Sequence, residues 1–285
     1  MGVGIISAGR VGAVIGSALR ATGHAITGAA AVSDASRSRA DELLRGVPIL
    51  DPATIAERSE LVILAVPDDE LPQLAAGLAC AGVVPGGQIF AHTSGRYGID
   101  VLKPLADAGA ITLAIHPAMT FTGTSLDLPR LIGCPWAVTA PAMFMPIATA
   151  LVVELDGEPF DVAEADRGTY HLALAHGSNH LVVLVDQVLT ILDEIGVQDP
   201  SRLVAPLLKA SLEGALSSGA NALTGPVKRG DAGTVAEHLG ALAELDHPLL
   251  EHAYRALALG ALNLAGLDDS TREHIRRLLT APAKD

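Results

Sequence analysis

Short apolar runs of strand length recur through the first half of the chain, each set off by a turn or a polar stretch. They span residues 2–6, 25–32, 47–50, 61–66, 88–92, 111–115, 136–139 and 159–162. Between them, residues 11–22 and 40–45 have the pattern of helices, and Pro141 suits the first turn of another. Alternation of this kind predicts an α/β domain with a doubly wound parallel sheet.

The second half changes to long helical segments. Residues 164–196 form one apolar helix with few charges between Tyr170 and Val185, and further helices are expected at 203–218, 231–245 and 247–266. A helix that is apolar on nearly every side is usually buried, so we expect this one in the middle of a helical domain or of a dimer. The pattern predicts two domains, residues 1–162 and 163–285, and a polar tail after Leu279 that frays.

Residues 7–12 form a glycine-rich turn between the first strand and the first helix. N–H groups at the start of such a helix can face a pyrophosphate. Gly9 would let the backbone approach the phosphates, and Gly12 would let the helix pack closely on the strand. Ser7 stands where the motif has its first glycine, so a turn without a ligand is the alternative. The residues expected to bind a dinucleotide here are Ser7, Ala8, Gly9, Arg10, Val11 and Gly12.

A second group of cofactor residues follows the second strand. NAD enzymes place an acid about twenty residues after the glycine turn, whereas this chain has Ser33, Ser36 and Arg37 there. Hydroxyls and a guanidinium suit a 2′-phosphate, so we predict NADP rather than NAD, although Asp34 could still face the ribose. The alternative is that Arg37 and Arg39 only solvate the start of a helix.

The carboxyl ends of the later strands are expected to line the same cleft, because ligands of doubly wound sheets bind beyond these ends. The most apolar run ends in three residues predicted to flank the nicotinamide, Ala65, Val66 and Pro67. The next two runs end in His92, followed by Thr93 and Ser94 as predicted substrate contacts, and in His116. We expect at least one of the two histidines to line the pocket; a structural role for both is the alternative.

Polar residues on the long helix form another candidate group. His171, Ala175, Ser178 and Asn179 fall on one helix face. Buried histidine and asparagine side chains need a hydrogen-bond partner or a ligand. We therefore predict that this face contacts a substrate, with a satisfied helix–helix contact as the alternative.

The segment 222–231 combines a Gly-Pro pair with a hydroxyl, two cations and an acid. The Gly-Pro pair excludes regular structure around it, and loops on rigid scaffolds often carry function. Thr224 is predicted to bind substrate, and Arg229 or Lys228 to hold a carboxylate, which a guanidinium can bind through two hydrogen bonds. The alternative is that Arg229 pairs with Asp231 and only shapes the loop.

Composition and charge narrow the function class. The 285 residues are 49% hydrophobic but only 3% aromatic, so the core must be built from Ala, Val, Leu and Ile. No apolar run is long enough to span a membrane, and the net charge of −13 comes without the basic cluster that nucleic-acid binding needs. Cys80 and Cys134 show no metal-ligand spacing and suggest no disulfide. With no signal peptide at the start, we expect a cytoplasmic protein without metal, membrane or nucleic-acid partners.

These motifs together resemble a bacterial family that pairs a Rossmann-like domain with a helical C-terminal domain of unknown function. The family is distantly similar to ketopantoate reductases, pyrroline-carboxylate reductases and β-hydroxyacid dehydrogenases. The resemblance implies an NADP-dependent reductase of a small oxo- or imino-carboxylate, with ketopantoate as the first expected substrate. It is carried by residues 7–12, 92–95, 116–121, 170–179, 223–231 and 238–239.

One position departs from that resemblance. Ketopantoate reductases and β-hydroxyacid dehydrogenases have a proton-donating lysine four residues before the helix asparagine, where this chain has Ala175. The resemblance then leaves Asn179 to orient the substrate oxygen and His171 to protonate it, with His116 as the second candidate. Pyrroline-carboxylate reductases lack this lysine too, so reduction of an imine stays open, as does a non-catalytic protein that senses NADP(H).

The apolar surface also predicts an assembly. Residues 172–185 and 256–267 are almost uniformly apolar, and they offer more apolar surface than one small helical domain can cover. Obligate interfaces are the usual place for such surface, so we expect a homodimer formed through the C-terminal helices.

Overall fold

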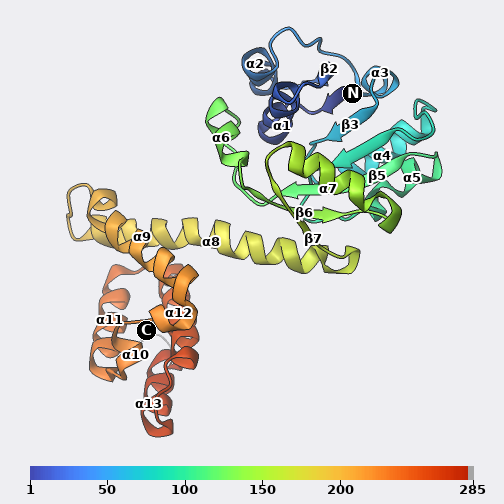
Figure 1. Ribbon diagram of the computed structural model, residues 1–285. Coiled ribbons are helices and arrows are strands. Elements are labelled where there is room, and N and C mark those ends of the chain that lie inside the picture. Colours follow the sequence, from blue (N-terminus) through green and yellow to red (C-terminus); the bar gives the residue numbers. More distant parts are fainter. Residues whose placement is uncertain (282–285) are drawn as a thin grey trace. The chain divides into compact units, whose positions relative to one another are not determined.

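The apolar runs of the first half form one seven-stranded sheet in a computed structural model that describes residues 1–281 (Figure 1). The strands are β1 (Gly2–Ile6), β2 (Ala25–Ala30), β3 (Leu61–Leu64), β4 (Ile89–His92), β5 (Ile111–Pro117), β6 (Pro135–Thr139) and β7 (Glu158–Asp161). Their order is β2-β1-β3-β4-β5-β6-β7, and every neighbouring pair is parallel except β5 and β6. The predicted α/β sheet is therefore confirmed, with one antiparallel pair.

Helices cover both faces of this sheet, because successive residues of a strand point to opposite sides. Ile5 and Ile63 point to one face and Ile6 and Phe90 to the other, and each pair lies in a separate apolar core. The first face is covered by α1 (Arg10–Ala21) and α7 (Met145–Glu154), the second by α3 (Pro52–Arg58), α4 (Leu71–Cys80) and α5 (Lys103–Asp107). Two further helices of this half are α2 (Asp34–Leu43) and α6 (Leu128–Leu131).

The structure differs from the expected pattern in several places here. Residues 47–50 are not a strand, since Ile49 makes only an isolated bridge with Ala29. Helix α2 begins six residues earlier than the predicted residue 40, at Asp34, because the Ser33 hydroxyl caps it by accepting the Ser36 N–H. Helices α3, α4, α5 and α6 were not expected, and α3 is capped in the same way by Asp51.

Strand β7 forms one edge of the sheet and pairs only with β6. The N–H of Glu158 donates to the Cys134 carbonyl, and the N–H of Val162, just beyond the strand, donates to the Val138 carbonyl. Pro159 follows Glu158 and has no N–H to donate.

By its internal contacts the chain divides into two units, Met1–Gly177 and Ser178–Asp285. The division falls within α8 (Arg167–Glu194), whereas the sequence predicts it at residue 162, after the last strand. The first turns of α8 belong to the sheet unit because Arg167 and Tyr170 make hydrogen bonds to residues of the strands.

The second unit is helical and has an aliphatic core that includes Val235, Leu262 and Ile275. Its helices beyond α8 are α9 (Pro200–Ser218), α10 (Pro226–Arg229), α11 (Ala232–Leu245), α12 (Pro248–Leu264) and α13 (Asp269–Thr280). Helix α10 corrects the prediction that the segment 222–231 lacks regular structure: Gly225 has a φ of 92° and the following proline starts a one-turn helix. Helix α13 was not expected, and of the tail predicted to fray, residues 282–285 lie outside the described residues.

Helix α8 exposes apolar side chains in the single chain, so of its two expected places, the middle of a helical domain or of a dimer, the second stays a prediction. Leu172, Val182 and Val183 are 65%, 69% and 51% exposed. Among the helices of residues 1–281, none is long and apolar enough to cross a membrane. The same residues contain no group of three His, Cys, Asp or Glu side chains placed to bind a metal, and both cysteines are free.

Candidate functional site

A groove of about 980 Å³ runs along the carboxyl ends of β1, β2 and β3 and is bordered by the first turn of α3 and by α4. Ligands of doubly wound sheets bind at this edge. Six residues predicted to bind a cofactor line the groove: Ser7, Gly9, Ser33, Ser36, Val66 and Pro67. The other six predicted residues do not line it: Ala8, Arg10, Val11, Gly12, Arg37 and Ala65.

The glycine turn keeps the dinucleotide-binding shape in spite of Ser7. Ser7 has a φ of 81°, the left-handed conformation that the first glycine of the motif normally supplies. A Cβ on Gly12 would collide with the Ser7 carbonyl oxygen and lie 3.0 Å from the Ala65 Cβ, so only glycine allows this helix to pack on the strand. A Cβ on Gly9 would lie 3.3 Å from the Ser7 hydroxyl and would have no other neighbour within 4 Å among residues 1–281. The backbone at Gly9 is therefore accessible to a phosphate.

The arginine that lines the groove is Arg39, not the predicted Arg37. Ser36 and Arg39 are three residues apart and share one face of α2, whereas Arg37 is exposed on another face. The Ser33 and Ser36 hydroxyls are engaged in the helix cap, where the Ser36 hydroxyl donates to the Ser33 carbonyl at 2.7 Å. Arg39 is thus the cation available to a 2′-phosphate.

A loop after β5 packs against this arginine. Gly123 has a φ of 81°, and a Cβ on it would lie 2.7 Å from the Arg39 Nε and 3.0 Å from the Arg10 Cγ. The carboxylate of fully buried Asp127 holds the loop in place by accepting the Gly123 N–H at 2.7 Å and the Thr122 hydroxyl at 3.0 Å. The backbone of this loop therefore supports Arg39 at the groove.

His92, at the end of β4, points into the core. Its Nδ1 accepts the Ser94 N–H at 3.2 Å, so in the neutral ring Nε2 donates to the Gly98 carbonyl at 2.7 Å. Burial lowers the pKa of His92 to about 4. The buried Ser94 hydroxyl accepts the N–H groups of residues 96 and 97. His92 and Ser94 therefore shape the loop that follows β4. Of the predicted residues 92–94, only Thr93 is half-buried and so accessible at the carboxyl edge of the sheet.

His116, at the end of β5, forms a pair with Tyr170 of α8. The His116 Nδ1 lies 2.8 Å from the Tyr170 hydroxyl, and the rings meet edge to face with centroids 5.6 Å apart. Both side chains are half-buried, and a Cβ on Gly95 would lie 2.9 Å from the His116 Nε2. The pKa of His116 is lowered to about 4, mainly by burial and to a smaller extent by the charges of Arg167 and His171. The imidazole is therefore neutral near pH 7 and cannot act as a cationic acid.

Arg167 lies against this pair and is only 1% exposed. Its Nε donates to the Thr139 hydroxyl at 2.7 Å, and its Nη2 donates to the Ala114 and Ala137 carbonyls at 3.0 and 3.2 Å. No carboxylate is among its hydrogen-bond acceptors within residues 1–281. Burial lowers the pKa of Arg167 to about 10, so it stays charged at neutral pH. Its guanidinium carbon lies 5.9 Å from the centre of the Tyr170 ring.

The other predicted site residues lie on α8 and in the helical unit. His171 is half-buried in the first unit, whereas Ser178 and Asn179 are exposed and belong to the second. Thr224 lines an apolar cavity of about 480 Å³ between helices of the second unit, and Arg229 is exposed at the end of α10. Of the predicted catalytic residues, the structure therefore brings His116 and His171 together.

Comparison with known proteins assigns both halves of the chain. Residues 1–117 match the family model of the Rossmann-like domain, and residues 134–261 match that of a domain of unknown function, DUF2520. The two matches follow one another along the chain and together span most of it. A search of the curated proteins finds no match.

Solved structures resemble this two-domain chain over nearly its whole length. A Bacteroides fragilis protein assigned as an NADP oxidoreductase has a TM-score of 0.76 at 19% identity, covering 92% of this chain and 97% of its own. An imine reductase from Myxococcus stipitatus in complex with NADP+ has a TM-score of 0.66 at 17% identity, covering 98% and 100%. A Plasmodium falciparum pyrroline carboxylate reductase with NADP bound has a TM-score of 0.57 at 10% identity, covering 98% of each chain. At these identities the likeness shows a shared fold.

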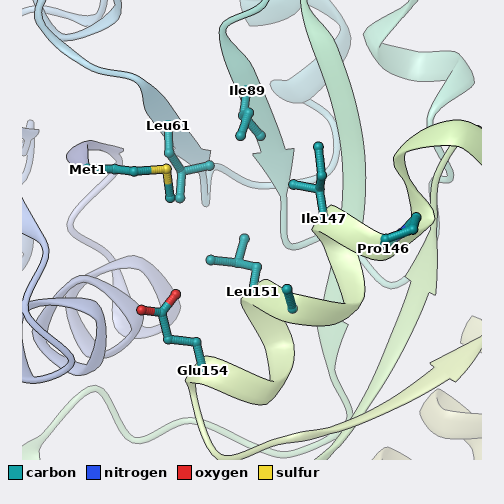
Figure 2. Close-up of a pocket in the computed structure, with 8 residues that line it drawn as sticks. Met1, Leu61, Ile89, Pro146, Ile147, Leu151 and Glu154 are labelled. Carbon is teal, nitrogen blue, oxygen red and sulfur yellow. The ribbon is translucent and has the colours of Figure 1, made fainter.

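A second hollow of the first unit lies at the opposite edge of the sheet, where β1, β3 and β4 begin (Figure 2). Met1, Leu61 and Ile89 line it together with apolar side chains of α7, and its volume is about 310 Å³. Its carboxylate, Glu154, lies 2.9 Å from the Nε2 of buried His24. Because this carboxylate is paired and the other lining residues are apolar, we assign no chemistry to the hollow.

Two residues of the DUF2520 match contact or lie close to His116 but were not predicted as site residues. Arg167 and Tyr170 are three residues apart and therefore share a helix face. This spacing is visible in the sequence. The missing signal was the burial of Arg167, since a charged residue in the first turn of a helix is normally expected in solvent.

Proposed function

We propose that this chain is an NADP-dependent oxidoreductase that reduces the C=O or C=N bond of a small carboxylate-bearing substrate. The observation that carries the proposal is the groove, in which open backbone at Gly9 and the guanidinium of Arg39 stand at the two places where a dinucleotide has its phosphates. Residues 7–12 would hold the pyrophosphate, Arg39 the 2′-phosphate, and Val66 and Pro67 the side nearest the nicotinamide. The bound cofactor would supply a hydride.

A proton must reach the substrate heteroatom as the hydride arrives, and the protein has to provide it. His116 lies at the carboxyl end of β5, on the same edge of the parallel strands as the groove, and it pairs with Tyr170 of α8, which His171 follows. We assign proton delivery to this cluster, and substrate orientation to Asn179. Thr93, Ser178, Thr224 and Arg229 remain proposed substrate contacts, the last through a carboxylate.

The substrate class that we favour is an imine or imino acid. Two of the solved structures above are an imine reductase and a pyrroline carboxylate reductase, and this chain has Ala175 where keto-acid reductases have a lysine. Ketopantoate is the second candidate, on the resemblance of the sequence alone.

Purified protein should consume NADPH in the presence of at least one member of a panel of cyclic imines, imino acids and 2-oxo acids. Loss of NADPH absorbance measures this, and reactions without substrate provide the background. Binding of NADPH without turnover on the panel would point instead to a non-catalytic NADP(H) sensor. Absence of NADPH binding would contradict the assignment of the groove.

We also propose that the protein is a homodimer formed through its C-terminal helices. The exposed apolar side chains of α8 and of α12, where Leu257 is 56% exposed, offer the kind of surface that an obligate interface covers. Light scattering at micromolar concentration should give twice the monomer mass. A monomer under these conditions would refute the proposal.

A further inference from the structure

We propose that the phenol of Tyr170 is the proton donor of the reduction, with His116 as its hydrogen-bond partner and Arg167 as the charge that stabilises its phenolate. This inference rests on the proposed function and names one of the three candidate side chains. It starts from the hydrogen bond of 2.8 Å between the Tyr170 hydroxyl and the His116 Nδ1. A half-buried phenol held in this way has a fixed direction, which a donor of protons requires.

His116 fits the role of partner and not that of donor. Burial and the neighbouring charge of Arg167 lower its pKa to about 4, so a neutral ring with a single N–H is present near pH 7. In the proposed tautomer the Nδ1–H donates to the phenol oxygen. This arrangement leaves the proton of Tyr170 free to point at a substrate heteroatom.

Arg167 fits the role of a fixed positive charge. Its side chain donates to neutral oxygens, the Thr139 hydroxyl and the Ala114 and Ala137 carbonyls, so the described residues provide no hydrogen-bonded carboxylate to neutralise it. The guanidinium lies 5.9 Å from the Tyr170 ring in a site shielded from water, where a charge acts more strongly than in solution.

The surroundings of Tyr170 keep its phenol protonated at neutral pH. Burial raises the pKa of its phenol, as does the Cys134 thiol, while the Arg167 charge acts in the opposite direction. The phenol therefore carries its proton at pH 7, and Arg167 reduces the cost of losing it. Glu164 is also near, but its carboxylate accepts the N–H groups of Ile99 and Asp100 and holds the loop after β4.

The step balances without a further reactant. With NADPH held by residues 7–12 and Arg39, the cofactor would supply the hydride for the new C–H bond and so be the reductant. The π bond of the C=N or C=O would break towards the heteroatom, and Tyr170 would give that atom its proton. The phenolate then regains its proton from water.

Tyr170→Phe tests the proposal, because it keeps the ring beside His116 and Arg167 and removes only the hydroxyl. Turnover should fall by about 10²–10⁴-fold, the usual contribution of a general acid, while the dissociation constant for NADPH stays the same. The matched control is Tyr97→Phe, since Tyr97 is half-buried beside the guanidinium of Arg96 in a similar way and should turn over substrate at the wild-type rate.

A second readout does not depend on turnover. The chain has three tyrosines, so tyrosinate absorbance during an alkaline titration resolves few components, and Tyr170→Phe identifies one of them. Saturating NADP+ should lower the pKa of that component by about half a unit or more, because a cationic ring stabilises a nearby phenolate. The components of the other two tyrosines should not change.

The outcomes separate this inference from the proposed function. An inactive wild type would refute the proposed function and the donor with it. An active wild type with unchanged turnover in Tyr170→Phe would refute the donor alone. A larger loss in His171→Ala than in Tyr170→Phe would assign the proton to His171, and a Tyr170 component that ignores NADP+ would place the phenol away from the reacting ring. Each of these four results overturns the inference.

Discussion

Replacing Arg39 with alanine should weaken NADPH binding by roughly 10- to 100-fold and leave NADH binding almost unchanged. Loss of a hydrogen bond to a charged group costs about 1.5–3 kcal/mol, and the 2′-phosphate that Arg39 would bind is present only in NADPH. Titration of wild type, Arg39→Ala and Arg37→Ala with NADPH and with NADH measures the change. Arg37→Ala is the control, because Arg37 is exposed and does not line the groove.

The support that the loop after β5 gives to Arg39 can be tested with a glycine pair. Gly123 and Gly133 both have positive φ, 81° and 69°, so alanine strains the backbone at either position. Only at Gly123 would the new methyl group meet a guanidinium, at 2.7 Å, since a Cβ on Gly133 has no neighbour within 4 Å. Gly123→Ala should therefore reduce the preference for NADPH, and Gly133→Ala should not. Equal preference in both variants, or a wild type that binds NADH as tightly as NADPH, would contradict the assignment of Arg39.

Replacing Arg167 with methionine should lower the free energy of unfolding of the first unit, Met1–Gly177, by about 2–4 kcal/mol. The substitution keeps much of the apolar stem but leaves the Ala114 and Ala137 carbonyls without the guanidinium, and a buried unsatisfied group costs about 1–3 kcal/mol. The measurement is urea denaturation followed by fluorescence of Trp136, which is fully buried in the same domain and is the only tryptophan of the chain.

Arg96→Met is the matched control for that substitution. Arg96 also lies over a tyrosine ring, with its guanidinium carbon 5.0 Å from the centre of Tyr97, but it is exposed. Its loss should change the stability by no more than about 0.5 kcal/mol. A similar stability of the two variants would show that the buried hydrogen bonds of Arg167 do not support the fold.

The sequence predicts the sheet well because buried parallel strands leave a simple pattern of apolar runs between turns. It fails where the same signal is short: residues 47–50 have the apolar character of a strand, yet they contribute one bridge at Ile49. Helices α3 and α4 escape prediction because each is short, with a proline in its first turn, and no long apolar period follows. A groove does lie at the edge of the sheet where the order of strand, turn and helix predicts a cofactor site.

The details of the site were harder to predict because they depend on helix rotation and on contacts between distant segments. Arg37 and Arg39 are equivalent in sequence, and only the start of α2 at Asp34 decides which of them faces the groove. The partner of His116 lies 54 residues away on α8, a distance over which no spacing rule operates. The exposure of α8 could not be predicted either, because an apolar helix looks the same whether its own chain or another covers it.

The edge strand β7 has a consequence for how this protein behaves at high concentration. Open sheet edges invite another strand to add, and repeated addition leads to aggregates. The N–H groups of Glu158 and Val162 face β6, so the alternating positions face outward, and the first of these is Pro159, which offers no donor. Exposed Asp161 follows and would bring its carboxylate to the side of any incoming strand. One missing N–H and one charge thus disfavour the addition of another strand at this edge.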